Sequence, residues 1–368
     1  MKKQQIRAWN IIIFGFIIAF VVGFFINFKV AKSKPESEDK SMEEILRMLR
    51  SIQKKTMSIP KPTQNCHFAS SEGRKCHQED RVTCDLNLKI PLFGHNGLEE
   101  VKVGAVAVFD GHFGSIASEM ASHIFLYKFM LKLNNSIEQS YNLKELLKSS
   151  LVTTIIDIDA EFSEHYSKRH RYSGSTAVVA LIYNNHVLVA NVGNSKAFVC
   201  SQKNISREAG AASLAGLHAE ELTRDHNVHR LDERARIEAS EGVLKIDHDF
   251  VPLFMSHVPT TRAIGVVTWK RFGVIANPEM TDWRSLTSKD EFLVVASDGI
   301  FESLAPQKVC DFLNEVEDHS DPSLLAQQLI QKAYLEGSSD NLLVVLVPLG
   351  SAVSGSPGCV EVVEKPYL

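Results

Sequence analysis

Six short stretches of the chain are almost continuously hydrophobic, as strands buried on both faces are. The predicted strands are 103–109, 176–183, 186–192, 195–200, 292–297 and 342–347. Longer stretches with apolar residues at helical spacing predict helices at 115–133, 143–168, 229–241, 306–317 and 322–336. Strands grouped in hairpins, with helices in blocks between them, predict an α+β fold with antiparallel sheets rather than a doubly wound parallel sheet.

The N-terminal pattern differs from the rest of the chain. Residues 9–28 contain no charged residue, and basic residues flank them on both sides. Such a run is long enough to cross a hydrocarbon core of about 30 Å. A cleaved secretory signal is the alternative, but the run is long for one and no small-x-small cleavage site follows it. We therefore expect an N-terminal transmembrane helix.

This expectation divides the chain into four parts. Residues 1–30 are a membrane anchor and residues 31–65 a polar juxtamembrane linker. The stretch 42–55 within the linker has an amphipathic stripe and forms either a short helix or a solvated tether. Residues 66–348 form the globular domain, and residues 349–368, which contain Ser, Gly and Pro, form a flexible tail.

Charge and cysteine content narrow the class of protein. The net charge of −4 provides no broad basic field for nucleic acid. Six cysteines at irregular spacing, without a C-x-x-C pair, favour reduced thiols in a cytosolic domain. We therefore expect a single-pass membrane protein whose globular domain faces the cytosol. The Asn-x-Ser sequons at Asn134 and Asn204 matter only if the domain lies outside the cytosol.

Acidic residues recur where predicted strands begin or end. Asp110-Gly111 follows one buried strand, and Asp298 follows another. Asp340 precedes the last strand, and Glu79-Asp80 stand before a further strand candidate. A lone Asp-Gly pair can simply begin a turn. Several such carboxylates together indicate a site for hard cations such as Mg²⁺ or Mn²⁺, and two ions there suit the hydrolysis of a phosphate ester.

The order of the motifs resembles one family. These motifs are GRKCHQEDR, VFDGHFG, SGSTAVVALI, VANVGNSKAFV, LTRDHN, ERARIEASEG, TRAIG, VIANPE, VVASDGIFESL and GSSDNLLVVLV. Together they resemble the metal-dependent protein phosphatases of the protein phosphatase 2C family over residues 66–348. The resemblance implies a four-layer αββα sandwich, in which two antiparallel sheets lie between helices. The membrane segment is also similar to that of membrane-anchored plant members.

The resemblance also implies a role for each site residue. Asp110 bridges two Mg²⁺ or Mn²⁺ ions, and the Gly111 carbonyl is a further ligand. Asp298 and Asp340 bind one ion and Glu79 the other, while Asp80 holds waters around them. His112 corresponds to the general acid that protonates the leaving oxygen of Ser or Thr; as an alternative, it is a turn residue bonded to a carbonyl.

Other positions depart from the family pattern. Lys75 stands where the family usually has the Arg that grips the substrate phosphate, so either Lys75 or the adjacent Arg74 takes that role. Arg171 and Glu302 replace two Asp residues of a third metal site, which makes a third ion doubtful. Val266 replaces an Asp that follows Gly265. The segment 227–262 matches a flap beside the site, where substrate choice often lies.

The sequence therefore predicts a metal-dependent protein serine/threonine phosphatase, with phosphoproteins as partners and no nucleic acid. In the implied mechanism, a water bridging the two ions attacks phosphorus. One alternative is a pseudophosphatase, a membrane-tethered binding module motivated by Lys75, Arg171 and Val266. Another is a different two-metal phosphoesterase such as a nuclease, against which the absence of a basic stacking groove counts.

Overall fold

The computed structural model describes residues 66–94, 97–136, 142–203, 216–240, 243–246, 249–252, 260–316 and 318–350. All of them belong to one of two compact units, which begins at Lys61. The predicted anchor, the linker and most of the predicted tail lie outside the described residues. Among the residues that are described, no helix combines the length and hydrophobicity needed to cross a membrane.

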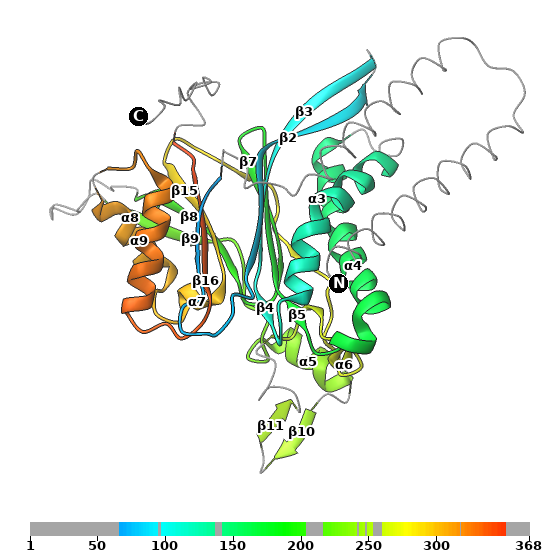
Figure 1. The fold of residues 1–368 in the computed structure, drawn as a ribbon. Helices are drawn as coiled ribbons and strands as arrows, with labels where there is room; N and C mark the ends of the chain where they lie inside the picture. Colours follow the sequence, from blue (N-terminus) through cyan, green and yellow to red (C-terminus); the bar gives the residue numbers. More distant parts are fainter. Residues whose placement is uncertain are drawn as a thin grey trace, which may run out of the picture. The chain divides into compact units, whose positions relative to one another are not determined.

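Two antiparallel sheets form the centre of this unit (Figure 1). The first has five strands, in the order β1 (His67–Ser71), β16 (Leu342–Pro348), β15 (Asp290–Ala296), β8 (Lys196–Gln202) and β9 (Leu217–Glu221). The second follows the order β13 (Glu279–Met280), β7 (His186–Val192), β6 (Ala177–Tyr183), β3 (Gly97–Phe109) and β2 (Arg81–Gly94), and β14 (Arg284–Ser285) also pairs with β7. The predicted α+β class with antiparallel sheets is confirmed.

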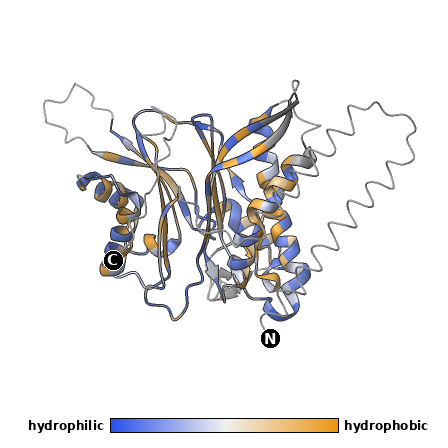
Figure 2. Cartoon of the chain, turned by 45° about the horizontal axis from the view of Figure 1, so that its top comes forward, coloured by the Kyte–Doolittle hydropathy of each residue, from blue (hydrophilic) through white to orange (hydrophobic). Residues whose placement is uncertain are grey.

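Helices cover the outer face of each sheet. Helices α3 (Ile116–Ser136) and α4 (Leu143–His170) pack on the second sheet. Helices α8 (Pro306–Glu315) and α9 (Pro322–Leu335) pack on the first. Figure 2 shows hydrophobic and hydrophilic colours alternating along these helices, as expected of helices with one buried face.

The strands are hydrophobic on both faces because each sheet lies between two layers. In β3, Val106 and Val108 pack between the sheets, whereas Ala105, Ala107 and Phe109 face α3 and α4. The last strand alternates in the same way, with Val345 between the sheets and Val344 toward α8 and α9. This double burial explains why these strands are continuous apolar runs in the sequence.

Smaller elements gather at one end of the sheets (Figure 1). A three-stranded sheet joins β4 (Gly111–His112), β5 (Gly174–Ser175) and β12 (Ile264–Gly265). Helix α7 (Asp298–Phe301) directly follows β15. The remaining elements are α5 (Leu231–Ala239), α6 (Val267–Lys270) and the hairpin of β10 (Val243–Ile246) and β11 (Asp249–Pro252).

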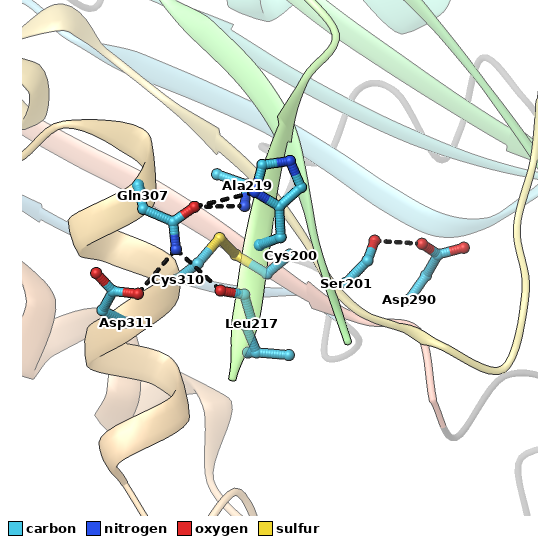
Figure 3. Close-up of a disulfide and its surroundings, with 9 residues drawn as sticks. Cys200, Ser201, Leu217, Ala219, Asp290, Gln307, Cys310 and Asp311 are labelled. Carbon is cyan, nitrogen blue, oxygen red and sulfur yellow. Dashed lines mark hydrogen bonds between the residues drawn. A yellow bond between two sulfur atoms is a disulfide. The ribbon is translucent and has the colours of Figure 1, made fainter. Parts of the chain in front are cut away.

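The prediction of reduced cysteines is wrong for four of the cysteines in the described part of the chain. Cys66 is bonded to Cys84, and Cys200 to Cys310. Figure 3 shows the second bond between β8 and α8, beside Gln307, whose side-chain amide donates to the Leu217 carbonyl at 2.9 Å. Spacing could not reveal this pair because 110 residues separate two cysteines that the fold brings to a Cα–Cα distance of 5.5 Å.

Candidate active site

Acidic side chains from four separate segments meet at the end of the sheets that carries β4 and β5. Asp110 follows β3, Asp298 begins α7 after β15, Asp340 precedes β16, and Asp80 precedes β2. The Asp298 backbone N–H donates to Asp110 Oδ2 at 3.3 Å. The strand-end carboxylates singled out in the sequence are thus neighbours in the structure.

The pKa values of these carboxyls show how crowded they are. Burial, together with the charges of Asp298 and Asp340, raises the pKa of Asp80 to about 7. Burial and the charges of Asp298 and Asp80 raise the pKa of Asp110 well above its ordinary value. Burial raises the pKa of Asp298 as well, although Asn194 Nδ2 donates to Asp298 Oδ2 at 2.6 Å. Such a cluster favours positive charge in its midst.

Asn341 fixes the first loop of the unit against its last strand. Its side-chain Nδ2 donates to the carbonyls of Glu72 and His77, both at 2.9 Å. Its Oδ1 accepts from the backbone N–H of Glu79, also at 2.9 Å. These three bonds hold the segment that carries Lys75, Glu79 and Asp80 against Asp340.

Close backbone approach explains the glycines that follow Asp110 and Asp298. A Cβ on Gly111 would lie 2.5 Å from the Glu79 carbonyl oxygen and 2.6 Å from Ser118 Oγ. A Cβ on Gly299 would lie 2.0 Å from the Asn341 carbonyl oxygen. Only glycine fits at either place, so both Asp-Gly pairs are packing requirements of the site as well as turns.

Glu79 is tied to the loop that follows β4. Its Oε2 accepts from the Gly114 backbone N–H at 3.1 Å, and its carbonyl accepts from Ser118 Oγ at 2.5 Å. The structure therefore places the Glu79 backbone beside Gly111 and its carboxylate on the loop that begins with Phe113.

His112 is partly buried, and the three-stranded sheet positions it. It pairs with Gly174 of β5, which in turn pairs with Gly265 of β12. The ring Nε2 is buried and has no hydrogen-bond partner among the described residues. Burial lowers the pKa of His112 to about 4, so the ring is neutral at neutral pH in the metal-free protein. No backbone carbonyl in the described ranges bonds to this nitrogen.

The two basic residues of the first loop have different surroundings. Lys75 Nζ lies 3.0 Å from Asp340 Oδ1. Partial burial lowers the Lys75 pKa, but the hydrogen bond and charge of Asp340 outweigh this and raise it. Arg74 instead donates to the carbonyls of Ser338 and Tyr334 and stacks 4.3 Å from the Tyr334 ring centroid. Of these two residues, Lys75 is the one that faces the carboxylates.

The positions that depart from the family pattern are also well defined. Arg171 is exposed and lies 4.9 Å from the Tyr172 ring centroid. Glu302 accepts from the Ser339 backbone N–H at 2.7 Å and from the hydroxyls of Ser338 and Ser339. Val266 has a left-handed backbone with φ of 41°, which is rare for a β-branched residue. An Arg and an already bonded Glu form a poor third cation site.

The donor set fits a hard divalent cation, although no cage is preformed. In the described part of the chain, no three His, Cys, Asp or Glu side chains are already arranged to hold an ion. The donors are nevertheless all oxygens, as Mg²⁺ and Mn²⁺ prefer. Asp80 Oδ2 is buried without a hydrogen-bond partner among the described residues. An unpaired buried carboxylate oxygen is costly unless a cation or a proton accompanies it.

Comparison with known proteins agrees with this arrangement. The model of the family described as "Protein phosphatase 2C" matches residues 65–342. The chain belongs to the protein phosphatase 2C family. It is 35% identical to "Probable protein phosphatase 2C 51" of Arabidopsis thaliana, over 78% of this chain and 71% of the relative. The structure of a serine-threonine phosphatase 2C from Toxoplasma gondii shares the fold, with 20% identity, a TM-score of 0.60 and coverage of 77% of this chain and 94% of that one.

Membership of the protein phosphatase 2C family confirms both the resemblance and the enzyme class, a protein serine/threonine phosphatase. Sequence reasoning gave no role to Asn194 or Asn341, although Asn341 directly follows a predicted ligand in the motif GSSDN. It also did not single out Gly174 as the residue packed against His112. Hydrogen bonds and close contacts between distant segments leave no periodic signal, so these roles emerge only from the structure.

Proposed function

We propose that the chain is a metal-dependent phosphatase that hydrolyses phosphoserine and phosphothreonine in proteins, using two Mg²⁺ or Mn²⁺ ions. The observation that carries this proposal is the meeting of Asp80, Asp110, Asp298 and Asp340 in a domain of the protein phosphatase 2C family. The four carboxyls come from four segments, so chance turns do not account for their convergence.

The ligands in this proposal are those named from the sequence. Asp110 would bind both ions, and the Gly111 carbonyl would be a further ligand. Asp298 and Asp340 would bind one ion and Glu79 the other, with Asp80 bonded to surrounding waters. Bound ions of this kind lower the pKa of water to produce a nucleophile and neutralise phosphoryl oxygens. A third ion is not part of the proposal, because Arg171 and Glu302 are poorly suited to hold it.

Two residues of the chain would act directly on the substrate. Lys75 keeps its positive charge beside the carboxylates and would pair with a phosphoryl oxygen. His112 would give a proton to the departing Ser or Thr oxygen, which requires the charged ring. A bound phosphate dianion raises the pKa of a neighbouring imidazole and so opposes the lowering by burial.

Phosphate release from phosphothreonine peptides by the full chain tests the proposal. We expect release that requires Mn²⁺ or Mg²⁺, and a fall of at least about a hundredfold in kcat for Asp298→Asn. Lys203→Glu, a charge change at the far end of β8, serves as the control. Equal release with and without metal, or full activity of Asp298→Asn, would contradict the proposal.

One observation favours the pseudophosphatase as a second candidate. The ammonium of Lys75 already occupies one side of Asp340, a predicted metal ligand. If this pair excluded the ions, the domain would bind phosphopeptides without turnover. Saturable peptide binding without phosphate release at any Mn²⁺ concentration would establish that function instead.

We also propose that residues 1–30 attach the domain to a membrane. The two disulfides bear on which side of the membrane the domain occupies, since disulfides persist in oxidising compartments and are rare in the cytosol. They favour an oxidising side over the cytosolic side expected from cysteine spacing. Protease protection of the domain in sealed vesicles, with and without detergent, distinguishes the two orientations.

A further inference from the structure

Three exposed arginines lie on the His112 side of the site. Arg169 is in the last turn of α4, Arg171 is the residue at its C-terminal cap, and Arg271 is the residue at the C-terminal cap of α6. Within the described ranges, none of the three side chains forms an ion pair with an acidic residue. We call these three residues the arginine rim.

Backbone contacts place this rim beside the candidate site. The Arg171 carbonyl accepts from the Thr268 backbone N–H at 3.3 Å, which holds α6 against the end of α4. Two residues further on, Ser173 Oγ donates to the Gly114 carbonyl at 2.8 Å. The next residue is Gly174, which pairs with His112. The C-terminal cap of α4 is therefore three residues from Gly174, the partner of the predicted general acid His112, and α6 is bonded to that same cap residue.

Helix electrostatics do not fully explain these charges. A cation in the last turn of α4 complements the partial negative charge at the helix C-terminus, which accounts for Arg169. Helix α6 has only four residues, so its dipole cannot explain Arg271. Lys270, the residue directly before Arg271, does have an acidic partner, Asp159, at 2.9 Å.

We propose that the arginine rim binds an acidic stretch of the phosphoprotein, next to the residue being dephosphorylated. Guanidinium groups bind carboxylates through two parallel hydrogen bonds, and the three rim arginines have no such partner within the described chain. Tyr172 is 45% exposed and stacks against the Arg171 guanidinium, and the Arg271 guanidinium lies 4.5 Å from the Phe272 ring centroid, so two of the three side chains are restricted. This inference rests on the proposed function for the identity of the peptide as substrate.

Two phosphothreonine peptides of equal length test the proposal, one flanked by glutamates and the other by lysines. For the full chain with Mn²⁺, we expect kcat/KM to be about tenfold higher for the glutamate peptide, and the ratio to shrink as salt rises. Arg171→Glu combined with Arg271→Glu should bring the ratio to one or below. The rate of each variant on p-nitrophenyl phosphate normalises the values, and Lys203→Glu is the matched charge control.

Binding provides a readout that does not depend on turnover. Fluorescence anisotropy with EDTA present measures the affinity of the same two peptides for the wild type and the double variant. If the wild type prefers the glutamate peptide and the double variant does not, the rim is supported. This holds even if neither peptide is hydrolysed, and in that case only the proposed function fails. Hydrolysis without any peptide preference, or a preference that the double variant keeps, overturns the rim.

Discussion

Gly174 leaves the space beside it to the His112 ring. A Cβ at this position would lie 2.4 Å from His112 Nε2 and 2.5 Å from Val266 Cγ1. Val266 holds its left-handed backbone through a hydrogen bond from its N–H to the Ser173 carbonyl at 2.8 Å. Neither Val266 nor β5 can therefore move away easily, so a larger residue at 174 must displace the imidazole.

We predict that Gly174→Ala impairs proton donation more than it impairs the rest of the reaction. Phosphothreonine has a poor leaving group that needs a proton, whereas the nitrophenolate of p-nitrophenyl phosphate leaves without one. The kcat for phosphothreonine peptides should fall about a hundredfold, and that for p-nitrophenyl phosphate much less. His112→Asn should show the same pattern. Equal losses on both substrates would mean that Gly174 does not position the acid.

The raised pKa of Asp80 predicts the pH dependence of stability in the metal-free protein. Its pKa is about 7 in the folded state, against an ordinary value of 3.8. Between these values the folded protein holds a proton that the unfolded chain lacks, so the free energy of unfolding falls as pH rises. In EDTA, Asp80 should therefore favour the folded state at pH 5 over pH 8 by on the order of 3 kcal/mol. His112 and His226 act in the opposite direction, because burial lowers the pKa of each to about 4, so this contribution is measured as the difference between wild type and a variant at residue 80.

Asp80→Asn is the matching control because it removes the titration with little change in shape. Relative to the wild type, this variant should lose the Asp80 contribution, whereas Asp110 and Asp298, whose pKa burial also raises, keep theirs. Added Mn²⁺ should reverse the trend by binding the ionised carboxylates. Identical pH profiles for wild type and Asp80→Asn would contradict the assignment.

At the scale of elements, α5 is held by one buried carboxylate. Glu233 accepts from Arg236 at 2.7 Å and from Arg262 at 2.6 Å, and also from the Thr261 hydroxyl. Burial raises the pKa of Glu233, but these donors outweigh it and lower that pKa. The network ties α5 to Thr261 and Arg262, which lead into β12.

We predict that Glu233→Ala strongly destabilises α5, because it leaves the guanidinium groups of Arg236 and Arg262 without their carboxylate partner. The loss should be about 3 kcal/mol, seen as faster hydrogen exchange in α5 and a lower urea midpoint. Glu238→Ala is the control on the same helix, since its pair with Arg234 is exposed and contributes about 0.5 kcal/mol or less. Comparable effects of the two changes would show that the buried network is not what holds α5.

The elements also show what the sequence could and could not predict. Every strand and helix predicted between residues 103 and 347 corresponds to one in the described part of the chain, because double burial produces continuous apolar runs and one-sided burial produces a helical period. The strands β1 and β9 were missed, since the sequences HFASS and LHAEE at sheet edges have no such pattern. The strand-end Asp residues were predictable, whereas the direction of Arg74 depends on carbonyls that only folding brings near.

Across the whole unit, the disulfide between Cys200 and Cys310 closes the longest covalent loop in the described part of the chain. Both residues are fully buried in the core under α8 and α9. Replacing both by alanine should lower the free energy of unfolding by about 4 kcal/mol, since cross-links over long loops restrict the unfolded chain most. Urea unfolding measures this, and Cys76→Ser, at an exposed free cysteine, is the control.

The state of the cysteines can be measured directly. Alkylation of the purified full chain under denaturing conditions, before and after reduction, followed by mass determination, should show four additional reactive thiols after reduction. Unchanged labelling would mean that the disulfides are not formed, and the cysteines would then not favour an oxidising compartment.

The hydrogen bonds of the Asn341 side chain have a consequence for when the domain can fold during translation. It joins the loop at Glu72 and His77, near the start of the unit, to the beginning of β16, its last strand. That strand also lies between β1 and β15, so the first sheet is incomplete without it. A ribosome must therefore translate nearly the entire domain before any catalytic pocket can assemble, and a transcript cut short before codon 340 yields no partially active product.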